Sequence, residues 1–188
     1  IFNNFCKRDF ARPGKSNVLS SNAMLACSHP IASSVGIEIL KSGGNAVDAA
    51  IAMNAVLCIA EPHMTGVGGD CFVMLSVDGS TNIKALNGSG KSSSNAKASA
   101  LRKNKLSVIT PEMPDAITIP GAVAAWSLLH KEHGYMSWKE LFNPAINFAN
   151  KGIKVHERVA LDWSKNIQKL SFDFDTSKLF LKNGKSFQ

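Results

Sequence analysis

The 188-residue sequence lacks an apolar run long enough to cross a membrane. A membrane-spanning helix needs about 18 to 20 predominantly apolar residues. The best candidate, residues 46–60, is shorter and carries Asp48 and Asn54. We therefore expect no membrane-spanning segment, and the hydrophobic content of 45% is enough for a sizeable globular core.

Cysteine is scarce and irregularly placed. The four residues are Cys6, Cys27, Cys58 and Cys71. They show no C-x-x-C spacing, the pattern typical of zinc and redox sites. Three of them stand among apolar neighbours, where a reduced thiol behaves as a small hydrophobic side chain. The spacing argues against a disulfide framework and leaves a single bridge open.

Arginine is scarce as well, since 17 Lys and 4 Arg against 14 acidic residues give the net charge of +7. The lysines are scattered through polar segments, whereas nucleic-acid binders gather them on one face or in a known module. We interpret them as a solvated surface and expect no nucleic-acid partner. Residues 1–22 are predicted to be a basic arm, without the apolar segment of a signal peptide. A cytoplasmic and a periplasmic location both stay open.

The common signatures of catalytic and metal sites are missing too. There is no G-x-S-x-G and no H-E-x-x-H motif, and no nucleophile has a base and an orienting residue in context. His130 and His133 have a spacing that can hold a metal, but no third ligand matches it. We predict no metal, no cofactor and no catalytic residue in this chain, and interpret the histidine pair as a polar helix end.

The most informative stretch that is present covers residues 40–72. Gly43 and Gly44 can close a helix, and Asn45 can cap an alanine-rich helix over about 46–60 that should lie in the interior of a layered fold. A glycine-rich loop at 66–69 then leads into a strand. It is not the dinucleotide fingerprint G-x-G-x-x-G, because Cys71 stands where the last glycine belongs and a strand follows in place of a helix. Asp70 ends this loop, either as a turn residue that bonds local N–H groups or as a residue that orients a site group.

Helices and strands alternate along the rest of the chain. A helix from Pro30 takes Ser28 or His29 as its cap, and Ser137 with Glu140 forms a capping box. Further helices are predicted at 93–105 (short), 120–133, 138–150 and 157–170, and strands at 23–27, 72–77, 82–86 and 117–119. The strands at 72–77 and 82–86 should form a hairpin. From the residues alone, this is a layered α/β or α+β domain.

A second glycine-rich segment follows the predicted hairpin. Gly90-Lys91-Ser92 matches the end of the phosphate-binding pattern G-x-x-x-x-G-K-[ST], although Ala85 stands where the first glycine belongs. No later strand ends in an Asp suited to magnesium. A nucleotide-binding module that uses Gly88–Ser92 is thus an alternative function, and a polar glycine loop lining a site is the preferred interpretation.

Taken together and in order, several segments resemble the amino-terminal half of the γ-glutamyltranspeptidases, or glutathione hydrolases. The matching blocks are ILKSGGNAVDAAIA at 39–52, GVGG at 66–69 before Phe72, IPGA at 119–122, LFNPA at 141–145 and ANKG at 149–152. The similarity spans about residues 23–159, and its most specific part is GGNAVDAA.

The resemblance implies the αββα sandwich of amino-terminal nucleophile hydrolases, an α+β fold that would be incomplete in this chain. Family members are precursors that cut themselves into two subunits, and the small subunit begins with a threonine that attacks a γ-glutamyl amide. On this resemblance, residues 23–188 belong to the large subunit, the small subunit of the same precursor is its partner, and the carboxy-terminal remainder with the nucleophile is absent. The fragment alone is then expected to be inactive.

One departure from the family bears on the substrate. In glutamyl-specific members, the loop after the hairpin carries an arginine that binds the substrate α-carboxylate. Here Ser89 stands about where the arginine would be, so the loop is more similar to those of γ-glutamyltranspeptidase-like proteins and acylases. The resemblance implies cleavage of γ-glutamyl or related glutaryl-type amides such as glutathione, with Asn87 and Ser89 lining the acyl pocket. A non-catalytic family relative is a further alternative.

Overall fold

The computed structural model describes residues 16–111 and 113–187, and the chain divides into two compact units. The larger unit is residues 26–153, and the described part of the other is residues 16–25 and 154–187. Of the predicted basic arm, residues 1–15 lie outside the described residues, while 16–22 form neither helix nor strand and are exposed. Among the described helices, none has the length and apolar character to span a bilayer.

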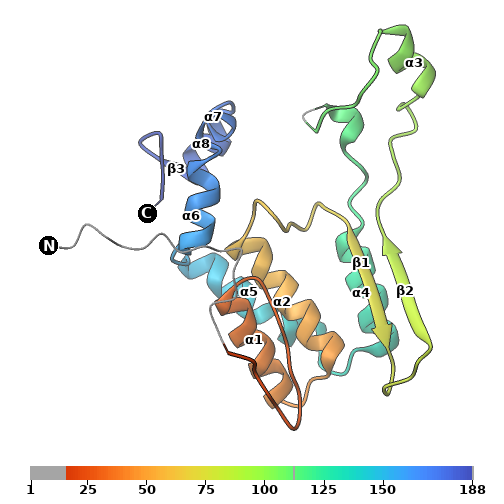
Figure 1. Cartoon of the computed structure of the whole chain (residues 1–188), viewed down its shortest axis with the longest axis vertical. Helices are drawn as coiled ribbons and strands as arrows, with labels where there is room; N and C mark the ends of the chain where they lie inside the picture. Colours follow the sequence, from red (N-terminus) through yellow and green to blue (C-terminus); the bar gives the residue numbers. More distant parts are fainter. Residues whose placement is uncertain (1–15, 112, 188) are drawn as a thin grey trace, which may run out of the picture. The chain divides into compact units, whose positions relative to one another are not determined.

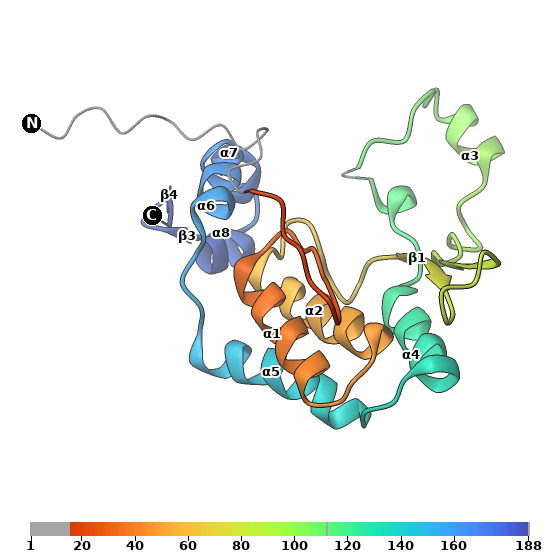
Figure 2. The same ribbon diagram turned by 60° about the horizontal axis from the view of Figure 1, so that its bottom comes forward.

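In the larger unit, α1 (Pro30–Lys41) and α5 (Trp138–Lys151) both pack against α2 (Ala46–Ala60), as Figures 1 and 2 show. The predicted bounds of α2 are confirmed. Its small side chains let the neighbouring helices approach closely, and Ala49, Ala52 and Val56 are all buried. The predicted interior position of this helix is therefore confirmed as well.

Local capping signals set the ends of these helices as predicted. The Nδ1 atom of His29 accepts a hydrogen bond from the N–H of Ile31 and caps α1. Asn45 with Asp48 forms a capping box at α2, and Ser137 with Glu140 forms one at α5. Each box satisfies backbone N–H groups that a helix start otherwise leaves without partners.

Asp48 also reaches beyond its own helix. Its carboxylate is fully buried and accepts hydrogen bonds from the N–H groups of Asn45 (3.0 Å), Tyr135 (3.1 Å) and Met136 (3.2 Å). The side-chain amide of Asn45 donates to the carbonyl oxygen of His133 at 2.6 Å. The start of α2 thereby holds the connection between α4 (Ala122–His133) and α5.

The predicted hairpin is confirmed as β1 (Cys71–Ser76) and β2 (Ile83–Gly88), an antiparallel pair. In its register Phe72 lies opposite Asn87, and Met74 lies opposite Ala85. Alternate residues of β1 are half-buried and the hairpin packs on α4, whereas Phe72 and Met74 on the other face are 70% and 79% exposed. The hairpin thus has one packed face and one open, largely apolar face.

Two predicted strands are wrong. The described residues contain only two separate antiparallel hairpins, and neither 23–27 nor 117–119 has a paired strand beside it. The Ile119 N–H makes a single bond to the Lys91 carbonyl oxygen (2.9 Å). A short 3₁₀ helix, η1 (Pro114–Ala116), precedes this segment, and the predicted short surface helix is α3 (Ala98–Lys103).

The described part of the smaller unit contains three short helices and one short hairpin. They are α6 (Glu157–Ser164), α7 (Ile167–Leu170), α8 (Phe174–Phe180), β3 (Leu181–Lys182) and β4 (Lys185–Ser186). The single helix predicted over 157–170 is wrong, because it breaks at Asn166, whose side chain bonds the carbonyl oxygen of Asp162. Buried Trp163 packs on Phe180 and Phe187 and forms the core of this unit.

Candidate functional site

Asn87 and Ser89, the residues predicted to line an acyl pocket, lie at the end of β2 and are exposed. The Oδ1 atom of Asn87 accepts hydrogen bonds from the N–H (3.0 Å) and the hydroxyl (2.7 Å) of Ser89. This is a local Asx turn, which fixes the two side chains relative to each other. The structure therefore brings the two predicted residues together in one small polar group.

The segment that follows Ser89 crosses residues 118–122 in direct backbone contact, and we call this contact the glycine crossing. A Cβ atom added to Gly90 would lie 1.4 Å from the carbonyl oxygen of Ile119, and one added to Gly121 would lie 2.2 Å from that of Gly88. A side chain at either position would overlap the opposite backbone. The glycines of this second loop are thus required by close approach, whereas Gly66 and Gly68 of the first loop have open space around them.

Asp70 ties the glycine crossing to the start of β1. Its Oδ1 atom accepts hydrogen bonds from the N–H of Gly90 (3.0 Å) and the hydroxyl of Thr118 (3.2 Å). These partners lie 20 and 48 residues away along the chain, so Asp70 is more than a local turn residue. The preceding carbonyl oxygen, of Gly69, accepts the N–H groups of Gly121 and Ala122 at the start of α4.

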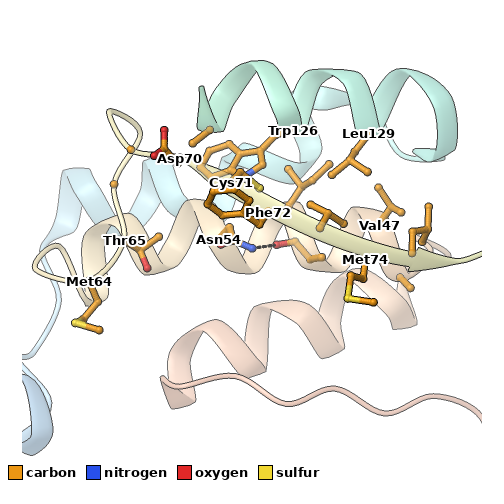
Figure 3. A pocket seen from close by; sticks show the side chains of 18 residues that line it. Val47, Asn54, Met64, Thr65, Asp70, Cys71, Phe72, Met74, Trp126 and Leu129 are labelled. Atoms are coloured by element: carbon orange, nitrogen blue, oxygen red, sulfur yellow. Dashed lines mark hydrogen bonds between the residues drawn. The ribbon is translucent and has the colours of Figure 1, made fainter. Parts of the chain in front are cut away.

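A cavity of about 570 Å³ lies between α2, the loop at 64–70, β1 and α4. Its walls include Val47, Trp126 and Leu129, with Thr65 and Asp70 at its polar end, as Figure 3 shows. Residues 46–54 and 64–75 meet α4 here, which lies far along the sequence, so no local motif reveals the cavity. Polar and apolar surface line it in similar measure, and neither Asn87 nor Ser89 is among its lining residues.

The thiols of the larger unit show no sign of nucleophilic activation. Cys27, Cys58 and Cys71 are free cysteines, and Cys6 lies outside the described residues. Burial raises the pKa of the Cys71 thiol, and a hydrogen bond with Trp126 opposes this effect only in part. Burial likewise raises the pKa of Cys58. Because the thiolate is the reactive form, these residues are packing elements.

The geometry after Gly90 does not form a phosphate loop. Such a loop places its Lys and Ser at the start of a helix, whose N–H groups hold the phosphates. Here Lys91 and Ser92 lie in exposed chain without helix or strand, and the next helix, α3, begins at Ala98. The alternative of a nucleotide-binding module at Gly88–Ser92 is therefore wrong.

The histidine pair stands at the end of α4. The Nε2 atom of His130 lies 2.7 Å from the carbonyl oxygen of Met136, and its ring packs edge-on against Trp138. His133 lies beside Glu132. Within residues 16–111 and 113–187, no three possible metal ligands form a cluster. His130 thus contributes to the link between α4 and α5, whereas the side-chain contact of His133 stays within α4.

Comparison with known proteins identifies relatives of this arrangement. A family model described as gamma-glutamyltranspeptidase matches residues 32–188. The glutathione hydrolase-like YwrD proenzyme of Bacillus subtilis (strain 168) is 35% identical over 170 residues, which are 90% of this chain and 32% of that protein. This chain therefore spans about a third of that relative's length.

Two solved structures have the same fold over most of the chain. The Helicobacter pylori gamma-glutamyltranspeptidase superposes with a TM-score of 0.82 at 25% identity, covering 92% of this chain and 50% of that one. The cephalosporin acylase from Bacillus halodurans gives a TM-score of 0.77 at 28% identity, covering 95% of this chain and 35% of that one. The likeness therefore extends to both units described above.

Proposed function

The chain belongs to the γ-glutamyltranspeptidase family, and we propose on that premise that it is part of a self-processing amide hydrolase or acyltransferase. Its α+β fold is of the amino-terminal nucleophile hydrolase type, of which this chain holds a part. The proposed substrates are γ-glutamyl or related glutaryl-type amides such as glutathione. The partner is the small subunit cut from the same precursor, a role consistent with the name proenzyme of the curated relative.

The proposed reaction passes through a threonine ester. The threonine hydroxyl attacks the amide carbon, its proton passes through the threonine α-amine to the departing amine, and the carbon–nitrogen bond breaks. Water or an acceptor amine then cleaves the ester and restores the hydroxyl. The nucleophile belongs to the small subunit, so the contribution of this chain is to bind and orient the acyl group.

The observation that supports a site in this chain is the polar pair at the end of β2. Asn87 and Ser89 are exposed and bonded to each other, and Asn87 lies opposite Phe72 on the open face of the hairpin. Their amide and hydroxyl can hydrogen-bond a carboxylate or amide of the acyl group without the fixed charge of an arginine. We therefore propose that they line the acyl pocket and that the acyl preference is broader than γ-glutamyl alone.

The full-length precursor tests this function directly. We expect it to cut itself before a threonine that starts a strand and then to release the amine from γ-glutamyl or glutaryl p-nitroanilide. Intact-mass spectrometry and amino-terminal sequencing report the cut, and absorbance reports the amine. A precursor that stays uncut and cleaves neither amide would contradict the proposal and favour a non-catalytic family relative.

The substitution Ser89→Arg tests the acyl pocket. A guanidinium near the α-carboxylate of a γ-glutamyl group adds a charge-assisted hydrogen bond, so kcat/KM for the γ-glutamyl amide should rise by about tenfold relative to the glutaryl amide. Ser94→Arg adds the same charge at an exposed position outside the pair and should leave this ratio unchanged. An unaltered ratio in Ser89→Arg would count against the pocket assignment.

A further inference from the structure

We propose that Asp70 is a positioning residue that holds the Asn87–Ser89 loop in place for the acyl group. The inference rests on the proposed function, because it concerns the same acyl pocket. Asp70 does not belong to the pair itself. It acts through the backbone of the next residue, Gly90.

The first step is the bond between Asp70 and the end of the loop. The Oδ1 atom of Asp70 accepts the N–H of Gly90 at 3.0 Å, and Gly90 directly follows Ser89. Ser89 is in turn bonded to Asn87 through both its N–H and its hydroxyl. A short series of contacts therefore connects the carboxylate to the two side chains that line the proposed pocket.

The second step is the restraint from the opposite side of the glycine crossing. Thr118 donates its hydroxyl to the same Oδ1 atom at 3.2 Å, and Ile119 donates its N–H to the carbonyl oxygen of Lys91 at 2.9 Å. The absence of a side chain at Gly90 lets these two segments touch. Asp70 thus lies where three segments meet, namely the start of β1, the end of the loop and residues 118–121.

The third step concerns what the carboxylate supplies. Asp70 is exposed, and a hydrogen bond at the surface adds little to global stability. Its loss should therefore affect the position of the loop far more than the folding of the protein. Because one oxygen receives both described bonds, an asparagine oxygen can replace it, whereas an alanine cannot. A role in binding a cationic substrate group would instead require the negative charge.

The test uses the full-length, self-processed enzyme and compares kcat and KM for γ-glutamyl and glutaryl p-nitroanilides. We expect Asp70→Ala to lower kcat/KM by about ten- to a hundredfold, because small misplacement of an orienting group is costly, and Asp70→Asn to stay within about twofold of wild type. Thr118→Val should lower kcat/KM by a smaller factor, and Thr118→Ser, which keeps the hydroxyl, should retain the wild-type value. Glu38→Ala removes an exposed carboxylate of α1 and should change nothing.

Hydrogen–deuterium exchange of the peptide covering residues 86–92 gives a second readout that does not depend on activity. Its exchange should be faster in Asp70→Ala and unchanged in Asp70→Asn. Equal losses of activity in the two variants, or unchanged exchange in Asp70→Ala, would overturn the positioning role. An inactive, uncut wild type overturns the proposed function and this role with it, whereas an active wild type with an equally active Asp70→Ala overturns this inference alone.

Discussion

The substitution Asp48→Ala should lower the free energy of unfolding by about 3 to 5 kcal/mol. The carboxylate is fully buried and accepts hydrogen bonds from three backbone N–H groups, those of Asn45, Tyr135 and Met136. An alanine leaves these donors without their acceptor around a side chain that is itself fully buried. Each buried donor that loses its partner costs about 1 to 3 kcal/mol.

The effect is large because Asp48 joins two parts of the chain. Asn45 caps the same helix and lies three residues away, whereas Tyr135 and Met136 belong to the connection between α4 and α5. Gly44 lies in the same junction, since a Cβ atom there would lie 2.7 Å from the Sδ atom of Met136 and 3.0 Å from the carbonyl oxygen of Ile39. The GGNAVDAA block therefore specifies a junction between segments as well as the start of a helix.

Urea unfolding of the purified protein, followed by tryptophan fluorescence, to which buried Trp126 contributes, measures this effect. Asp48→Asn should also destabilise, because its amide group would place a donor against the N–H of Tyr135, which now bonds both carboxylate oxygens. The matched control is Asp78→Asn, in the exposed hairpin turn where φ is 54° and asparagine is well tolerated. The control should stay within about 0.5 kcal/mol of wild type. If Asp48→Ala changed the free energy of unfolding as little as this control, the hydrogen bonds of Asp48 would not contribute to stability.

The predictions that succeeded rest on local rules. His29 before Pro30, Asn45 with Asp48, and Ser137 with Glu140 each specify a helix start within four residues, so the sequence alone was sufficient. The hairpin likewise follows from two apolar runs around one turn. These elements need no knowledge of distant parts of the chain.

The helix predicted over 157–170 fails for a local reason, the break at Asn166, but the two strand predictions that failed depend on partners far along the sequence. Residues 23–27 and 117–119 have the composition of strands, but a strand requires a paired neighbour, and composition cannot supply one. The same reason hides the partners of Asp70, because Gly90 and Thr118 meet it only after the chain has folded. A family resemblance was sufficient to single out Asn87 and Ser89, but the hydrogen bonds that hold their loop are visible only in the structure.

We expect Gly90→Ala to be the most damaging single substitution in the glycine crossing. The added Cβ atom would lie 1.4 Å from the carbonyl oxygen of Ile119, and real Cβ atoms essentially never come within 3.0 Å of another heavy atom. Both neighbours are backbone, so no side-chain rotation relieves the overlap. The two segments must separate, and the bonds from Gly90 to Asp70 and from Ile119 to Lys91 would be lost together.

The expected result is a loss of about a hundredfold or more in kcat/KM of the full-length enzyme, with faster hydrogen exchange in residues 86–92. Gly66→Ala is the matched control, because it makes the same change in the other glycine loop, where nothing lies within 4 Å and φ is not in the left-handed region. That variant should be neutral or slightly stabilising, since alanine restricts the unfolded chain. If the two variants had the same kcat/KM and the same hydrogen exchange, the glycine crossing would not hold the loop. A loss confined to Gly90→Ala, together with normal self-cleavage before the threonine, would place the defect in the acyl pocket, because the nucleophile would then be intact.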